Sequence, residues 1–365
     1  PILRRDLERQ GVTFRTNSDT EVLLKAYRQY GTDCFDRFEG MWALALFDAR
    51  RQELLLSRDR FGEKPLYLFA ENGTLYFGSE IKFLESMREV SFEPNLDHVK
   101  RYLVNGYKAL HKQPEGFMKG VRELPPGTYS LQSKAGWPEP VRYWQLDYNP
   151  VEMSVESALN GVQERLDRAV ELRLRADVPV AFCLSGGVDS TALAVIAARR
   201  FDADIHTFSI IDSDERYDES ENISAVVAAL GCHHTEVHTT TDGFFDRLDM
   251  LIDYHDGPLA TLSYYVHSFL SESISNAGFK VSVSGTAADE LFTGYYDHYG
   301  FWLAEMADSA DFPQMLEDWR HSYGAFVRNP LLQDPLAFRK NPDQRGHIYL
   351  DRGIFNNMLH EPIDE

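Results

Sequence analysis

Short apolar runs separated by polar turns dominate the first part of the chain. The four clearest runs lie at 41–47, 53–57, 66–69 and 75–78. Asn72 and Gly73 separate the last two runs, and Asn-Gly between apolar runs is a strong signal for a two-residue β-hairpin turn. This part is therefore predicted to be mostly antiparallel sheet, with a helix over residues 20–30.

The pattern changes after a polar segment, 145–154, that resembles a linker. Apolar side chains recur every three or four residues over 159–174, as in an amphipathic helix. Helix-like segments then alternate with apolar runs: the predicted helices are 191–200 and 220–230, and the predicted strands are 178–184, 205–211, 234–239 and 279–284. This alternation indicates βαβ units, an α/β fold with a doubly wound parallel sheet. Residues 296–365 are expected to be helical.

Length and composition narrow the class of protein. The 365 residues fit two domains of about 100–200 residues each, which the change of pattern places at 1–145 and 146–365. With 57 acidic and 37 basic residues the net charge is −20, which argues against nucleic-acid or membrane-surface partners. No apolar run is long enough to span a membrane. The three cysteines form no CxxC pair, which favours a reducing cytoplasm over a disulfide framework.

One segment carries the clearest chemistry, because it follows a predicted buried strand and opens a predicted helix. It comprises Cys183, Leu184, Ser185, Gly186, Gly187, Val188, Asp189, Ser190 and Thr191. Its glycines let the backbone approach an anion, its serines offer hydroxyls, and the helix N-terminus offers free N–H groups. The carboxylate of Asp189 beside a phosphate needs a counter-ion, for which Mg²⁺ is the natural choice. An ordinary strand–turn–helix is the plainer alternative, but the whole string resembles the PP-loop of enzymes that split ATP into AMP and pyrophosphate.

A second loop supports this interpretation. Ser284, Gly285, Thr286, Ala287, Ala288, Asp289 and Glu290 lie at the end of the predicted strand 279–284. Ligands of open α/β sheets bind outside the carboxyl ends of the strands, so Ser185, Ile210 and Ser284 are expected at one edge. Acidic residues that begin the next helix are the alternative role for Asp289 and Glu290.

With both loops in hand, the chain resembles the glutamine-hydrolysing asparagine synthetase family over nearly its whole length. In the second part the likeness includes the two loops, Ile205–Ile210 and Tyr217-Asp218-Glu219. In the first part it includes Ser18–Glu21, Phe38–Met41, Arg58–Gly62, Lys64–Tyr67, Phe77–Lys82, Leu124–Gly127 and Arg142–Trp144. The resemblance implies an α+β class II glutaminase domain that releases ammonia from glutamine. It also implies a PP-loop domain that adenylates a carboxylate with ATP and Mg²⁺ before ammonia attacks the acyl-adenylate.

The resemblance also implies roles for individual residues. Asp19 would bind the α-amino group of glutamine, and as an alternative or in addition it would cap the helix over 20–30. Backbone groups of Cys183 and Ile210 would hold adenine and ribose. The segment Ser185–Ser190 would hold pyrophosphate, with Ser284 and Gly285 also contacting the nucleotide. The candidate Mg²⁺ ligands are Asp189 and Asp289, and the candidate catalytic residues are Thr286 and Asp289.

The sequence departs from the family pattern in ways that affect the expected reaction. No N-terminal nucleophilic Cys is present, and the internal Cys34 has no free α-amino group, so this chain is expected to be a fragment, truncated at both ends, that does not hydrolyse glutamine. Thr286 stands where many members have Glu, and a hydroxyl cannot replace a carboxylate in proton transfer. Asp256-Gly257-Pro258 replaces the more usual Asp-Glu-Pro.

These departures leave the acceptor and the activity open. The acceptor carboxylate is aspartate or another acid, such as a sugar uronic acid. A non-catalytic relative and a PP-loop sulfur-transfer enzyme are the alternatives, and a homodimer is possible from the family.

Two further groups of residues have plain structural interpretations. His234 and His238 would face the same side of a strand, and we expect strand packing rather than a metal site that also uses His255 or His267. Arg58-Asp59-Arg60 is expected to form a turn with ion pairs.

Overall fold

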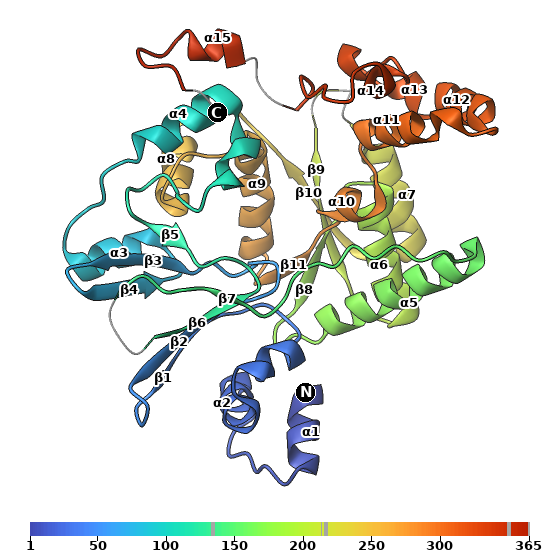
Figure 1. The fold of residues 1–365 in the computed structure, drawn as a ribbon. Coiled ribbons are helices and arrows are strands. Elements are labelled where there is room, and N and C mark those ends of the chain that lie inside the picture. Colours follow the sequence, from blue (N-terminus) through green and yellow to red (C-terminus); the bar gives the residue numbers. More distant parts are fainter. Residues whose placement is uncertain (133–135, 213, 215–217, 349–351, 364–365) are drawn as a thin grey trace. The chain divides into compact units, whose positions relative to one another are not determined.

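The computed structural model describes residues 1–132, 136–212, 214, 218–348 and 352–363 (Figure 1). Its contacts divide the chain into two compact units. The first unit comprises Pro1–Pro150, Asp256–Pro258 and Asn356–Glu365, and the second comprises Val151–His255 and Leu259–Phe355. Each helix of the described chain is either too short or too polar to span a membrane.

The first unit contains two antiparallel sheets, as predicted. One has the order β1 (Ala43–Asp48), β2 (Glu53–Arg58), β6 (Thr128–Gln132), β7 (Val141–Arg142), and the other β4 (Thr74–Gly78), β3 (Tyr67–Glu71), β5 (Arg122–Glu123). The β3–β4 hairpin turns through Asn72 and Gly73, with φ of 49° and 76°. Positive φ at both central residues defines the type I′ turn that Asn-Gly favours, so the hairpin prediction is confirmed.

Helices of the first unit pack on these sheets. They are α1 (Ile2–Arg9), α2 (Asp19–Tyr30), α3 (Ile81–Arg88) and α4 (Leu96–Asn105), with 3₁₀ segments η1 (Gly31–Arg37) and η2 (Tyr107–Lys112). Leu7, Ala26, Phe35 and Leu55 form a buried cluster that joins α1, α2, η1 and β2. The predicted helix over 20–30 corresponds to α2 and is confirmed.

The second unit is built on a parallel sheet of order β10-β9-β8-β11. The strands are β8 (Val180–Cys183), β9 (His206–Ile211), β10 (His233–His238) and β11 (Val281–Val283). Its main helices are α5 (Val155–Leu174), α6 (Val188–Arg200), α7 (Ser220–Leu230), α8 (Phe244–His255) and α9 (Ser263–Asn276).

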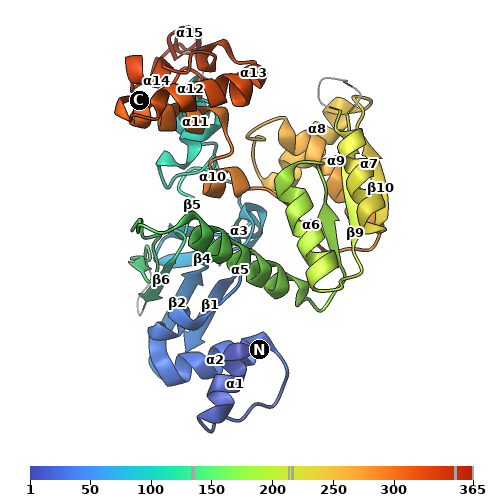
Figure 2. The same ribbon diagram turned by 90° about the vertical axis from the view of Figure 1, so that its right-hand side faces the viewer.

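Helices cover both faces of this sheet, with α6 on one side and α9 on the other (Figures 1 and 2). Phe182 packs with Val170 of α5 and Ala194 of α6. Its neighbour Ala181 packs with Phe208 and with Ile274 of α9. Successive strand residues face opposite sides, so β8 is buried on both faces, and the predicted doubly wound parallel sheet is confirmed.

The elements described beyond β11 are all helical, as predicted. The elements are α10 (Ala288–Phe292), α11 (Tyr296–Glu305), η3 (Met306–Asp308), α12 (Phe312–His321), α13 (Tyr323–Phe326), η4 (Pro330–Leu332), α14 (Ala337–Lys340) and α15 (Arg352–Asn356). Leu303, Trp319 and Val327 form a small separate core that holds α11 and α12 together.

Candidate active site

The loop after β8 presents a helix N-terminus to solvent. Leu184 leaves the sheet with its N–H donated to the carbonyl of Phe208, at 2.9 Å. The helix α6 then begins at Val188, and its N-cap residue Gly187 supplies no capping side chain. The first N–H groups of such a helix lack intrahelical partners and carry a partial positive charge. This loop can therefore receive an anion.

Two serine hydroxyls shape the loop from within. The Oγ atoms of Ser185 and Ser190 lie 3.0 Å apart, and the N–H of Ser185 donates to Ser190 Oγ at 3.1 Å. Ser190 is only 5% exposed, whereas Ser185 is exposed. Ser190 thus holds the loop curled, and Ser185 is the hydroxyl that a ligand can reach.

Gly186 fits the loop tightly against α7. Its φ is +75°, and a Cβ there would lie 3.0 Å from Cβ of Asn222 and 3.3 Å from Cγ1 of Ile223. A side chain would be strained by the backbone and blocked by α7. Nothing in the sequence pattern pointed to Asn222, because this contact depends on how α7 returns to the loop.

The second loop touches the first at the backbone. A Cβ on Gly285 would lie 2.8 Å from the backbone nitrogen of Ser190 and 3.0 Å from Cβ of Asp189. Ser284 donates to Thr286 Oγ1 at 3.0 Å, and Thr286 is exposed. Asp289 lies in the first turn of α10, so both candidate metal ligands sit in first helical turns.

Three strand ends share this edge of the sheet. β8 pairs in parallel with both β9 and β11, so Ser185, Ile210 and Ser284 follow or lie at the carboxyl ends of neighbouring strands. The expectation that these exits share one edge is confirmed. Burial raises the pKa of the Cys183 thiol, which keeps it protonated and fits its position as a strand residue opposite Phe208.

The donor chemistry fits Mg²⁺ bound together with phosphate. No hydrogen bond or ion pair from the described residues reaches the half-buried carboxylate of Asp189. Mg²⁺ commonly uses one or two protein carboxylates and takes its remaining ligands from phosphate and water. No cluster of three or more His, Cys, Asp or Glu side chains suited to a metal occurs in the described parts of the chain.

His234 belongs to the packing of the sheet. His234 Nδ1 lies 2.9 Å from Thr207 Oγ1, and burial lowers the pKa of His234. His238 is exposed and lies 4.0 Å from Glu236. The contact of His234 supports the strand-packing interpretation, whereas His238 lies on the exposed surface of the strand.

In the first unit, Asp19 does not cap α2. Ser18 is the N-cap, and its side chain accepts from the N–H of Thr20. Asp19 is the first helical residue and is exposed, so the capping role expected for it is wrong and its carboxylate is left accessible. Glu21 accepts from the N–H groups of Arg15 and Thr16, at 3.0 and 2.7 Å, which fixes the loop before the helix.

Arg58 and Asp59 form a buried structural centre, as expected of this turn. Arg58 donates to the carboxylate of Glu123 at 2.5 Å and to the carbonyls of Gly62 and Lys64 at 2.8 Å. Asp59 accepts from several backbone N–H groups of the following turn. The motif therefore links β2 of one antiparallel sheet to β5 of the other.

Tyr217, part of another segment that resembles the family, lies outside the described residues.

Two family models match the chain. A glutamine amidotransferase domain matches residues 1–144, and an asparagine synthase domain matches residues 161–356. The chain is 32% identical to asparagine synthetase (glutamine-hydrolysing) 3 of Bacillus subtilis (strain 168), over 80% of this chain and 49% of that protein. It is 33% identical to the protein named "Putative asparagine synthetase (glutamine-hydrolyzing)" of Mycobacterium tuberculosis (strain H37Rv), over 97% of this chain and 54% of the other.

The chain is also similar to proteins with other names. Amidase chyE of Penicillium rubens is 31% identical over 77% of this chain and 44% of its own. Among solved structures, the NH3-dependent NAD synthetase of Campylobacter jejuni matches with 15% identity and a TM-score of 0.27, over 50% of this chain and 93% of that one. The chain spans about half the length of the curated relatives it matches. With more than half of its residues in the asparagine synthase match, the chain belongs to the asparagine synthase family.

Proposed function

We propose that this protein is an ATP-dependent amidotransferase that adenylates a carboxylic acid and converts it to an amide. The contact between Gly285 and the first turn of α6 carries the proposal. It joins two strand-exit loops into one surface with a helix N-terminus, exposed hydroxyls and the carboxylate of Asp189, with which no other described residue pairs. Such a surface suits the pyrophosphate part of a nucleotide.

In the proposed reaction, a carboxylate oxygen of the acceptor attacks the α-phosphorus of ATP, and the bond to pyrophosphate breaks. The N–H groups that open α6 and the hydroxyl of Ser185 hold the departing pyrophosphate. Mg²⁺ at Asp189 and Asp289 would neutralise charge on the phosphate oxygens. Ammonia then attacks the acyl carbon, AMP leaves, and the amide nitrogen loses a proton.

The nucleotide would lie along the neighbouring strand exits. We propose that backbone groups of Cys183 and Ile210 border adenine and ribose, and that Ser284 and Gly285 border the phosphates. We propose that ammonia comes from glutamine, bound in the whole protein with its α-amino group at Asp19. The exposed carboxylate of Asp19, at the first residue of α2, supports this role.

Thr286 bears on the choice of acceptor. It is exposed and accepts a hydrogen bond from Ser284, so it offers a hydroxyl where a carboxylate would supply charge and take a proton. We therefore propose aspartate or a related acid, including a sugar uronic acid, as the acceptor. The three free cysteines fit our proposal that the enzyme works in the cytoplasm.

ATP–pyrophosphate exchange tests the proposal. The protein is incubated with ATP, Mg²⁺, labelled pyrophosphate and one carboxylate at a time from a panel that includes aspartate and uronic acids. Exchange that depends on one carboxylate identifies the acceptor. Exchange with none, in a preparation whose fold is verified by circular dichroism, would contradict the proposal and favour a non-catalytic relative.

A further inference from the structure

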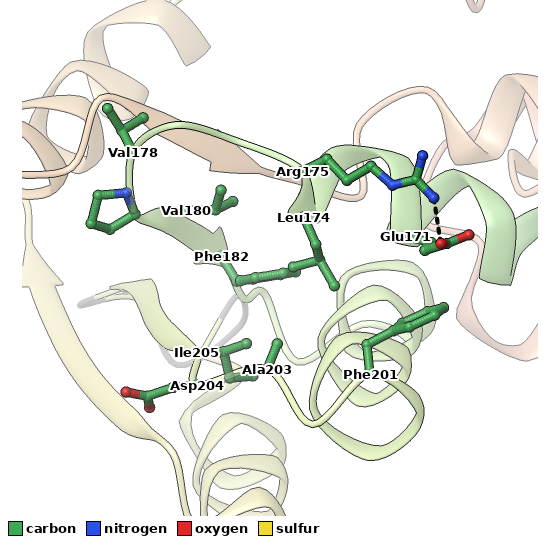
Figure 3. A pocket seen from close by; sticks show the side chains of 11 residues that line it. Glu171, Leu174, Arg175, Val178, Val180, Phe182, Phe201, Ala203, Asp204 and Ile205 are labelled. Carbon is green, nitrogen blue, oxygen red and sulfur yellow. Dashed lines mark hydrogen bonds and ion pairs between the residues drawn. The ribbon is translucent and has the colours of Figure 1, made fainter. Parts of the chain in front are cut away.

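A cavity of about 430 Å³ opens at the amino-terminal edge of the parallel sheet (Figure 3). Leu174, Val180, Phe182 and Phe201 give it an apolar lining. β8 runs from Val180 in this cavity to Cys183, so the cavity and the candidate active site lie at opposite ends of the same strand. Small-molecule sites in proteins have volumes of about 300–1,000 Å³ and mostly apolar linings, and this cavity falls within that range.

The charged groups at the cavity leave it negative. Glu171 and Arg175 pair at 2.5 Å and cancel each other. Asp204 also lines the cavity, on the side away from that pair (Figure 3). Among the described residues Asp204 has no hydrogen bond or ion pair through its side chain. The formal balance of the three groups is therefore −1.

Two helix ends add to this negative potential. α5 ends at Leu174, and α6 ends at Arg200, next to Phe201 of the lining. The C-terminus of a helix carries a partial negative charge. The last-turn arginines of α6 do not line the cavity: Arg199 donates to the carbonyl of Ala229, and Arg200 pairs with Asp167.

We propose that this cavity binds a small organic monocation, a primary ammonium group on a compact aliphatic or aromatic body. The ammonium would donate to the carboxylate of Asp204, and the apolar body would pack on Val180 and Phe182. The charged residues of the lining disfavour an anion or a metal ion as the ligand. An anion would have to displace Glu171 from Arg175, and a metal ion would find one unpaired carboxylate where it needs several ligands.

Calorimetric titration of the protein with 2-phenylethylamine tests this inference, with 2-phenylethanol and 3-phenylpropionate as the neutral and anionic probes. We expect saturable binding of the amine alone. Asp204→Asn should weaken that binding about fivefold, the upper range for an ion pair open to solvent. Ala203→Leu, which extends a lining residue into the cavity, should abolish it.

Asp202→Asn is the matched control, because Asp202 is a neighbouring exposed carboxylate that is not part of the lining. It should bind the amine as the unmodified protein does. Equal binding of the alcohol, no saturable binding of the amine, or binding unaffected by Asp204→Asn would each overturn the inference. ATP is absent from these titrations, so their result is independent of pyrophosphate exchange.

Discussion

Gly285→Ala is the sharpest perturbation of the proposed nucleotide site, because the added methyl group would meet backbone atoms. The new Cβ would lie 2.8 Å from the nitrogen of Ser190 and 3.2 Å from the carbonyl carbon of Asp189. Ordinary contacts between such atoms begin at about 3.5 Å. The second loop must therefore retreat from α6 by about 0.7 Å, the difference between 3.5 and 2.8 Å.

A shift of this size should affect both stability and activity. Overpacking costs about 1–3 kcal/mol, which chemical denaturation of the variant should show. Misplacing reacting groups by about 1 Å can reduce the rate 100-fold, so we expect ATP–pyrophosphate exchange to fall by about 10- to 100-fold in kcat/KM for ATP. Gly116→Ala is the control, because a Cβ there meets nothing within 4 Å. A folded Gly285→Ala variant with unchanged exchange would refute the idea that the two loops form one site.

Three further predictions concern the first unit. Arg58→Met should lower the free energy of unfolding by about 3 kcal/mol, because the buried guanidinium pairs with Glu123 and donates to several carbonyls. Urea titration measures this, and a loss below about 0.5 kcal/mol, typical of neutral surface positions, would refute it. Desolvation lowers the pKa of Lys82, but hydrogen bonds to Glu80 and Asp256 more than offset it and raise that pKa above its ordinary value of 10.5. The stability that Lys82→Met removes should therefore be fully present below pH 10.5 and vanish as the pH rises through the raised pKa; a pH-independent difference would contradict this. Burial raises the pKa of Cys34 to about 12, so iodoacetamide should modify it at pH 8 only on unfolding, followed by mass spectrometry, and rapid labelling of the folded protein would contradict the prediction.

Local signals explain why much of the fold is predictable. Asn72-Gly73 specifies its turn because both residues accept positive φ. Gly231, with φ of 63°, ends α7 where the sequence suggests that a helix should stop. The parallel sheet follows from the alternation of helix and strand patterns, since parallel neighbours require long crossovers.

Contacts distant in sequence account for what the pattern does not reveal. Asp256, between α8 and α9, accepts from the backbone N–H of Lys82 at 3.2 Å and belongs to the first unit. Neither helix is among the elements predicted from the sequence. Asp19 was expected as a cap because it precedes a helical pattern, but Ser18 takes that position one residue earlier. A one-residue difference in where a helix begins changes the role of each residue in its first turn.

Gly186, Gly187 and Gly285, the three glycines of the two loops, differ in what an added side chain would meet. The difference separates glycines that the packing of the loops requires from one that leaves room for a ligand. Gly186 and Gly285 each face protein atoms at 3.0 Å or less, so their lack of a side chain is already explained by how the loops fit together. A Cβ on Gly187 would meet only the hydroxyl of Ser185, at 3.3 Å. Internal packing therefore leaves the space beside Gly187 almost open, directly before the first turn of α6. Of the three glycines, Gly187 is the one that internal packing constrains least, and it is also the one at the proposed phosphate site.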